Sequence, residues 1–132
     1  MKFFGIGTDI VSIDRISKLL KNRNFLKRIF NEKEILKCKK INKSSNCFAK
    51  RFAAKEAFSK ALGTGIAKGI NFNEIIILNK KSGKPFINFI GQTKKTLNKR
   101  FNGKKSKVSL SLSDENKYAV AFVTISLWIK KN

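Results

Sequence analysis

The chain has 132 residues, enough for one hydrophobic core and too few for two ordinary domains, so we expect a single domain over residues 1–132. It has no histidine, which excludes Ser-His-Asp and Cys-His catalysis and zinc sites with histidine ligands. Its 30 Lys and Arg against 8 Asp and Glu give a formal charge of +22. That charge favours a negatively charged partner, although mutational drift toward AT-rich codons, which include those of lysine, explains it equally well.

The N-terminal segment lacks the pattern of a signal peptide, because glycines and Asp9 interrupt its apolar residues. The longest apolar run, residues 119–129, contains two hydroxyl residues and is shorter than the roughly 20 residues that a membrane-spanning helix needs. We therefore expect a cytoplasmic protein that does not bind a membrane. In that reducing compartment, Cys38 and Cys47 are expected to be buried or idle thiols without a role.

The first expected element is a strand over residues 2–11, because apolar side chains alternate there with Gly5, Gly7 and Asp9. Ser12 is the expected N-cap of a short basic amphipathic helix. Further short helices are expected at residues 25–30 and 32–39, followed by a loop at residues 41–46.

Residues 47–62 predict the strongest helix of the chain, which is rich in Ala, Lys and Phe. Its expected N-cap is Ser45 or Asn46, and Gly63 is expected to end it. Downstream the sequence predicts a loop at residues 63–69, and then a buried strand at 75–78 that a turn at 82–85 joins to a strand at 86–90. A helix is expected at 92–100. The last expected element is an antiparallel pair of strands at 108–129 with a turn over 114–117.

Glu56 and Lys60 lie on the face of the long helix that also carries small, core-facing residues such as Ala53. A carboxylate or an ammonium group that is buried alone costs free energy, so each needs a partner. The simplest partnership is an i, i+4 ion pair between the two, worth only about 0.2–0.5 kcal/mol. Taken alone, these two residues favour that interpretation.

Asp9 supports a second interpretation, because it lies on the glycine face of the first strand, where another backbone can approach closely. If the long helix packs there, Asp9 and Glu56 form a two-carboxylate site of the kind that suits Mg²⁺, with Lys60 facing phosphates. The alternative is that Asp9 caps the helix that follows the strand.

Two blocks of the chain, GIGTDIVSIDRI and RFAAKEAFSKALGTGI, resemble the paired signature of the holo-acyl carrier protein synthase family within the 4'-phosphopantetheinyl transferase superfamily. The SGKP turn, the SLSDENKYAVA segment and the spacing between the blocks extend the resemblance over nearly the whole chain. The resemblance implies an α+β fold, with an antiparallel or mixed sheet and one long central helix, and a homotrimer with active sites between subunits.

The activity implied by the resemblance is Mg²⁺-dependent transfer of the 4'-phosphopantetheine arm of coenzyme A to a serine of apo-acyl carrier protein, in support of fatty acid biosynthesis. Asp9, Glu56 and Lys60 are the implied catalytic residues. Asp9 and Glu56 would bind Mg²⁺, Lys60 would contact the phosphates, and Glu56 is the candidate to take the serine proton. The other implied contacts are Arg51, Gly63, Gly65, Gly83, Lys84 and Pro85 for coenzyme A, and Arg15, Lys18 and Lys21 for the acidic carrier protein.

Some family members carry histidine at the position of Asp114, so no role of that histidine transfers to this chain. We expect Asp114 to be a turn-forming residue. The main competing hypothesis is a basic nucleic-acid-binding protein, but no nucleic-acid motif is present, and Asp9 and Glu56 would repel phosphates without a metal. A family member that binds without catalysis is a further alternative, and the presence of all three catalytic residues argues against it.

Overall fold

The structure is a computed structural model that describes residues 1–63 and 68–130. One sheet has the strand order β1-β5-β4, and β2 and β3 form a separate hairpin, with antiparallel pairing throughout the described residues. The predicted α+β fold is therefore confirmed, with antiparallel rather than mixed sheets. The elements are β1 (Lys2–Ser12), α1 (Ile13–Leu19), α2 (Arg23–Ile29), α3 (Glu32–Lys39), α4 (Ser44–Leu62), the 3-10 helix η1 (Phe72–Glu74), β2 (Ile75–Asn79), β3 (Pro85–Phe89), α5 (Gly91–Arg100), β4 (Ser106–Glu115) and β5 (Tyr118–Leu127).

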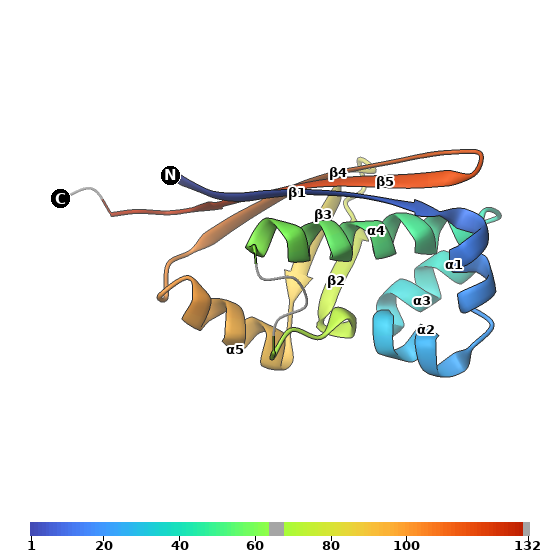
Figure 1. The fold of residues 1–132 in the computed structure, drawn as a ribbon, viewed down its shortest axis with the longest axis horizontal. Helices are drawn as coiled ribbons and strands as arrows, with labels where there is room; N and C mark the ends of the chain where they lie inside the picture. Colours follow the sequence, from blue (N-terminus) through green and yellow to red (C-terminus); the bar gives the residue numbers. More distant parts are fainter. Residues whose placement is uncertain (64–67, 131–132) are drawn as a thin grey trace.

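Helix α4 lies at the centre of the fold, directly against one face of the three-stranded sheet (Figure 1). Helices α1, α2 and α3 gather near its N-terminal end, and α5 lies near the other end. The β2–β3 hairpin contacts α4 as well. No helix of residues 1–63 and 68–130 is long and apolar enough to cross a membrane.

The close approach of β1 to α4 depends on small residues on both elements. The helix presents alanines at every fourth position, and all of them are buried. A Cβ atom on Gly5 would collide with the carbonyl oxygen of Ala61, and one on Gly7 with that of Ala57. The prediction that the glycine face of the first strand admits another backbone is thus confirmed.

The two ends of α4 show which local signals determine its limits. Gly63 ends the helix in the left-handed conformation, with φ of 81°, as predicted. The predicted N-cap is wrong, because α4 begins at Ser44 and neither Ser45 nor Asn46 caps it. Both side chains instead make tertiary contacts: the Ser45 hydroxyl donates to Ser17, and the Asn46 amide donates to Asp114.

Asp114 lies in strand β4 opposite Ala119, so its predicted role in a turn is wrong. Only Asn116 and Lys117 separate the paired residues of the hairpin, and Asn116 has the positive φ, 45°, that such a tight turn requires. The Asp114 carboxylate accepts a 2.7 Å hydrogen bond from Asn46 and lies 3.1 Å from Lys50 Nζ. These two contacts hold the pKa of Asp114 below its ordinary value.

Cys38 and Cys47 are both buried, as expected, but they are not separate thiols. Their sulfur atoms are bonded to each other, which joins the end of α3 to the first turns of α4. Nine positions separate the two residues along the chain. A pairing could not be expected from the sequence, because the expected compartment keeps thiols reduced.

We predict that Gly7→Ala lowers the free energy of unfolding by about 3 kcal/mol, because the new methyl group has no space beside Ala57. Gly63→Ala is the matched control, since no described residue lies within 4 Å of its Cβ and the positive φ opposes it at a cost of about 1 kcal/mol. Urea unfolding of both variants measures the difference. Equal losses would show that β1 and α4 are not in close contact.

Candidate active site

Asp9 on β1 and Lys60 on α4 form an ion pair across the contact between these two elements. Lys60 Nζ lies 3.1 Å from Asp9 Oδ1 and donates a 3.1 Å hydrogen bond to the carbonyl oxygen of Thr8. The Asp9 side chain is only 16% exposed, whereas that of Lys60 is 57% exposed. The expected N-cap, Ser12, is confirmed, which rules out the alternative that Asp9 caps α1. Among the described residues Lys60 pairs with Asp9 rather than with Glu56.

Glu56 lies beside this pair and is half-buried. Burial, and secondly the nearby Asp9 carboxylate, raise its pKa above the ordinary value, while Lys60 and Arg15 act in the opposite direction. The structure thus brings together the two carboxylates and the lysine that the sequence singled out. Arg15 of α1 is near enough to influence them electrostatically.

The donor set of this cluster fits a hard divalent cation. Mg²⁺ prefers carboxylate oxygens and keeps several coordination positions for water or phosphate. In residues 1–63 and 68–130, no group of three or more His, Cys, Asp or Glu side chains is placed to hold a metal. Asp9 and Glu56 alone would leave most positions of a bound Mg²⁺ open to substrate oxygens.

A second feature is a cavity of about 740 Å³ between α4, the turn after β2 and strand β4. Three residues predicted to contact coenzyme A line it, namely Arg51, Gly83 and Pro85, whereas Lys84 does not. The other polar residues of the lining could not be singled out from the sequence, because the chain contains so many lysines that none of them stands out. These residues include Lys37, Lys43, Asn46, Lys50, Asn79, Lys80, Lys81 and Asp114.

Arg51 is 3% exposed, and its guanidinium group is bonded mainly to the protein. Nε donates to the carbonyl oxygen of Ile77, Nη1 donates to Cys47, and Nη2 donates to Asn79 Oδ1 at 2.7 Å. Nη2 keeps one N–H for which no described residue is an acceptor. Arg51 therefore supports the cavity wall and has at most limited capacity to bind a ligand directly.

The carboxylate cluster and the cavity lie on different sides of α4. Arg51 and Glu56 are five positions apart, which places them about 140° apart around the helix axis. Arg51 accordingly faces β2, and Lys60 faces β1. Of the described residues that line the cavity, none is Asp9, Glu56 or Lys60.

The remaining predicted site residues lie around these two features. Gly63 is exposed at the end of α4, and Gly65 lies outside the described residues. The three residues predicted to bind the carrier protein, Arg15, Lys18 and Lys21, are exposed on α1 and just after it.

The family model of the 4'-phosphopantetheinyl transferase superfamily matches residues 5–123. The chain belongs to this superfamily. A holo-[acyl-carrier-protein] synthase of Pelagibacter ubique is 50% identical over 125 residues, which cover 95% of this chain and 98% of that protein. The corresponding synthase of Ehrlichia chaffeensis is 48% identical, with 92% and 94% covered.

Solved phosphopantetheinyl transferases have the same fold. The holo-[acyl-carrier-protein] synthase of Neisseria meningitidis superposes with a TM-score of 0.83 at 43% identity, covering 94% of this chain and 98% of that one. A Bacillus anthracis synthase in complex with CoA (3',5'-ADP) superposes with a TM-score of 0.77 at 35% identity, covering 95% and 97%. The alternative of a nucleic-acid-binding protein finds no support in these similarities.

We predict that Glu56→Gln raises the melting temperature of the metal-free protein at pH 8. The raised pKa means that the folded state binds this proton more tightly than the unfolded state, so folding loses stability as the pH rises through the folded pKa. An amide at this position cannot ionise and so avoids that loss of stability. The gain in melting temperature should vanish below about pH 4, where the Glu56 carboxyl is protonated in both the folded and the unfolded state. Thermal melts in EDTA at both pH values measure it, with Glu115→Gln as the control. A lower melting temperature at pH 8 would contradict this account of Glu56.

Proposed function

We propose that the chain is a holo-acyl carrier protein synthase, which transfers the 4'-phosphopantetheine moiety of coenzyme A to a serine of apo-acyl carrier protein. The observation that carries the proposal is the cluster of Asp9, Glu56 and Lys60, since it joins both blocks of the resemblance at the β1–α4 contact. Two similar proteins agree with it, because the Bacillus anthracis and Helicobacter pylori synthases are known in complex with coenzyme A or its nucleotide part.

In the proposed reaction, the serine hydroxyl oxygen attacks the β-phosphorus of coenzyme A. A new phosphorus–oxygen bond forms as the bond to the bridging oxygen breaks, and adenosine 3',5'-bisphosphate leaves with that electron pair. Glu56 takes the serine proton, directly or through a water molecule, as the half-buried carboxylate beside Asp9 and Lys60. Lys60, which is exposed beside Asp9, offsets the charge that builds up on the leaving group.

Asp9 and Glu56 would hold Mg²⁺ in this proposal. When bound, the cation neutralises the pyrophosphate and orients it for in-line displacement. The nucleotide phosphates would lie in the lysine-lined cavity, beside Gly83, Pro85 and the lysines of the preceding turn. Lys84 is retained as a proposed contact from the family pattern, although it does not line that cavity.

The cluster and the cavity occupy different sides of α4, and we propose that a coenzyme A molecule that touches both lies between two copies of the chain. The outer face of the three-stranded sheet offers a surface for this association. It exposes Ile6, Ile10, Val120 and Phe122, of which Ile10 is 62% exposed, and large exposed apolar patches mark interaction sites. We propose a homotrimer closed by heterologous contacts, with the site residues shared between neighbours.

The basic side chains of α1 suit an acidic carrier protein, since complementary charge speeds encounter and orients the partner. Arg15 is both exposed and electrostatically coupled to Glu56, so a protein docked on α1 would approach the proposed catalytic residues. We further propose a cytoplasmic role in fatty acid biosynthesis.

Incubation of apo-acyl carrier protein with coenzyme A, Mg²⁺ and the chain should add one phosphopantetheine to the carrier protein, as seen by intact mass. Glu56→Gln should slow the transfer by at least about a hundredfold, because a base and a metal ligand are removed together. Excess EDTA should stop it. If several carrier proteins gain no mass, the proposed function is wrong.

Phe122→Lys should convert the trimer to monomers that keep their circular dichroism spectrum, because the charge cannot be buried between copies. Light scattering after gel filtration measures the mass, and transfer should fall by at least about tenfold. Asn98→Lys on exposed α5 is the matched control. A fully active Phe122→Lys monomer would rule out a site shared between copies.

A further inference from the structure

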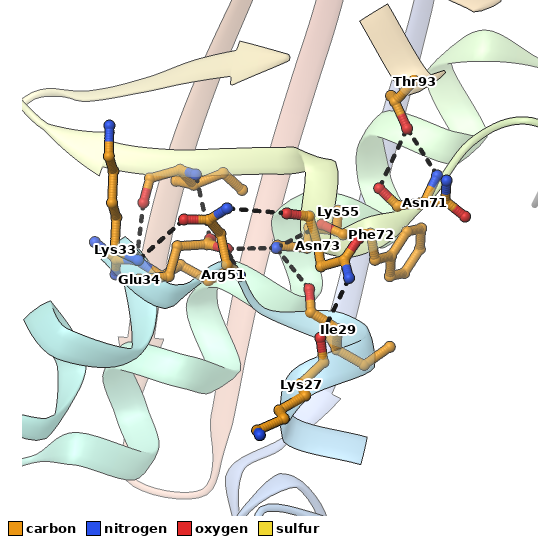
Figure 2. A network of polar contacts seen from close by, with 12 residues as sticks. Lys27, Ile29, Lys33, Glu34, Arg51, Lys55, Asn71, Phe72, Asn73 and Thr93 are labelled. Atoms are coloured by element: carbon orange, nitrogen blue, oxygen red, sulfur yellow. Dashed lines mark hydrogen bonds and ion pairs between the residues drawn. The ribbon is translucent and has the colours of Figure 1, made fainter. Parts of the chain in front are cut away.

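A buried ion pair that the proposed mechanism does not use joins α3 to α4 (Figure 2). Lys55 and Glu34 have fully buried side chains, with Lys55 Nζ 2.6 Å from Glu34 Oε1. The same Nζ donates to the carbonyl oxygens of Ile29 at 2.7 Å and Phe72 at 2.8 Å. All three donors of the ammonium group are therefore used, which explains how a buried lysine is tolerated.

The second oxygen of Glu34 has a different partner. Oε2 accepts a 3.2 Å hydrogen bond from the backbone N–H of Ile77, in the middle of β2. The carbonyl oxygen of the same residue accepts a 3.0 Å hydrogen bond from Arg51 Nε. Strand β2 pairs only with β3 among the described strands, so side chains from α3 and α4 take the place of a further strand along its free edge.

From Arg51 the hydrogen bonds continue to the turn that lines the cavity. Arg51 Nη2 donates to Asn79 Oδ1 at 2.7 Å, and Asn79 Nδ2 donates to the carbonyl oxygen of Gly83 at 2.9 Å. Two backbone hydrogen bonds close the turn itself, from Gly83 to Lys80 and from Lys80 to Lys84. The buried network thus reaches the residues proposed to contact the nucleotide.

We infer that Glu34 and Asn79 are positioning residues for coenzyme A, which fix the turn of residues 80–84 against α4 without taking part in the transfer. The inference rests on the proposed function, because it takes coenzyme A as the occupant of the cavity. Glu34 is fully buried and cannot touch that ligand, so any effect of Glu34 on coenzyme A affinity must act through β2 and its turn.

The test compares Glu34→Gln with Glu32→Gln, the same change at an exposed position of the same helix. A glutamine side chain has one acceptor oxygen, so it cannot serve both Lys55 and Ile77. We expect the KM for coenzyme A to rise about fivefold, the effect of one lost hydrogen bond, while kcat and the KM for the carrier protein stay within about twofold. Hydrogen exchange of residues 75–89, measured without coenzyme A, should become faster in Glu34→Gln alone.

Asn79→Ala keeps the buried ion pair and provides a second variant if Glu34→Gln does not fold. It too should raise the KM for coenzyme A and speed exchange in the turn. Combining Glu34→Gln, or Asn79→Ala in its place, with Lys80→Ala/Lys81→Ala tests the route. The combined increase in the KM for coenzyme A should be smaller than the two separate increases predict, because the turn that Glu34 and Asn79 position no longer carries these lysines.

A fall in kcat with an unchanged KM for coenzyme A, or strictly additive effects, would overturn the inference and leave Glu34 and Asn79 as general stabilising residues. Unchanged exchange in the turn would overturn it as well. These results are distinct from failure of the proposed function, in which the unaltered chain transfers nothing, whereas the exchange comparison needs neither coenzyme A nor activity.

Discussion

The backbone of strand β1 lies directly against helix α4, and every functional feature of the molecule is arranged around that contact. It requires glycines on the strand, because a Cβ on Gly5 or Gly7 would collide with carbonyl oxygens of the helix. It also requires the buried alanines that recur every four residues on α4. Beside this small-residue contact, Asp9 meets Lys60 and Glu56.

The contact also explains why the carboxylate cluster and the cavity lie on different sides of α4. One side of α4 is used against the sheet, where Lys60 reaches β1, and Arg51 on another side holds β2. A single helix therefore organises both a carboxylate cluster and a lysine-lined cavity, which we propose meet around one ligand between neighbouring copies. Association through the exposed outer face of the sheet would bring the two features of neighbouring copies together.

The scarcity of acidic residues made part of this arrangement predictable from sequence. Asp9 stood out because it shares a strand face with two glycines, and Glu56 because it lies among small core-facing residues. Three of the other six acidic residues have structural contacts: Glu34 pairs with Lys55, Asp114 binds Asn46 and Lys50, and Glu74 accepts hydrogen bonds from Asn71, Gln92 and Thr93. The high positive charge thus leaves most lysines without an acidic partner, which suits an anionic substrate and an acidic protein alike.

Other features could not be read from the sequence, for physical reasons. Glu34 forms a capping box with Asn31 and resembles an ordinary helix-start glutamate, and its burial depends on Lys55, 21 positions away. Asn46 and Ser45 resemble helix caps, but tertiary partners compete for their side chains. The lysines of the cavity differ from the other lysines only in where the turn after β2 places them.

The most direct test of the central claim, a site shared between copies, is to mix two differently damaged subunits. Glu56→Gln removes one carboxylate of the cluster, and Lys80→Ala/Lys81→Ala removes two lysines that line the cavity. Each alone should transfer poorly at subsaturating coenzyme A. Co-expression should restore activity well above the sum of the two, because some interfaces then join an intact cluster to an intact cavity. Activity no higher than that sum would show that one copy carries a complete site.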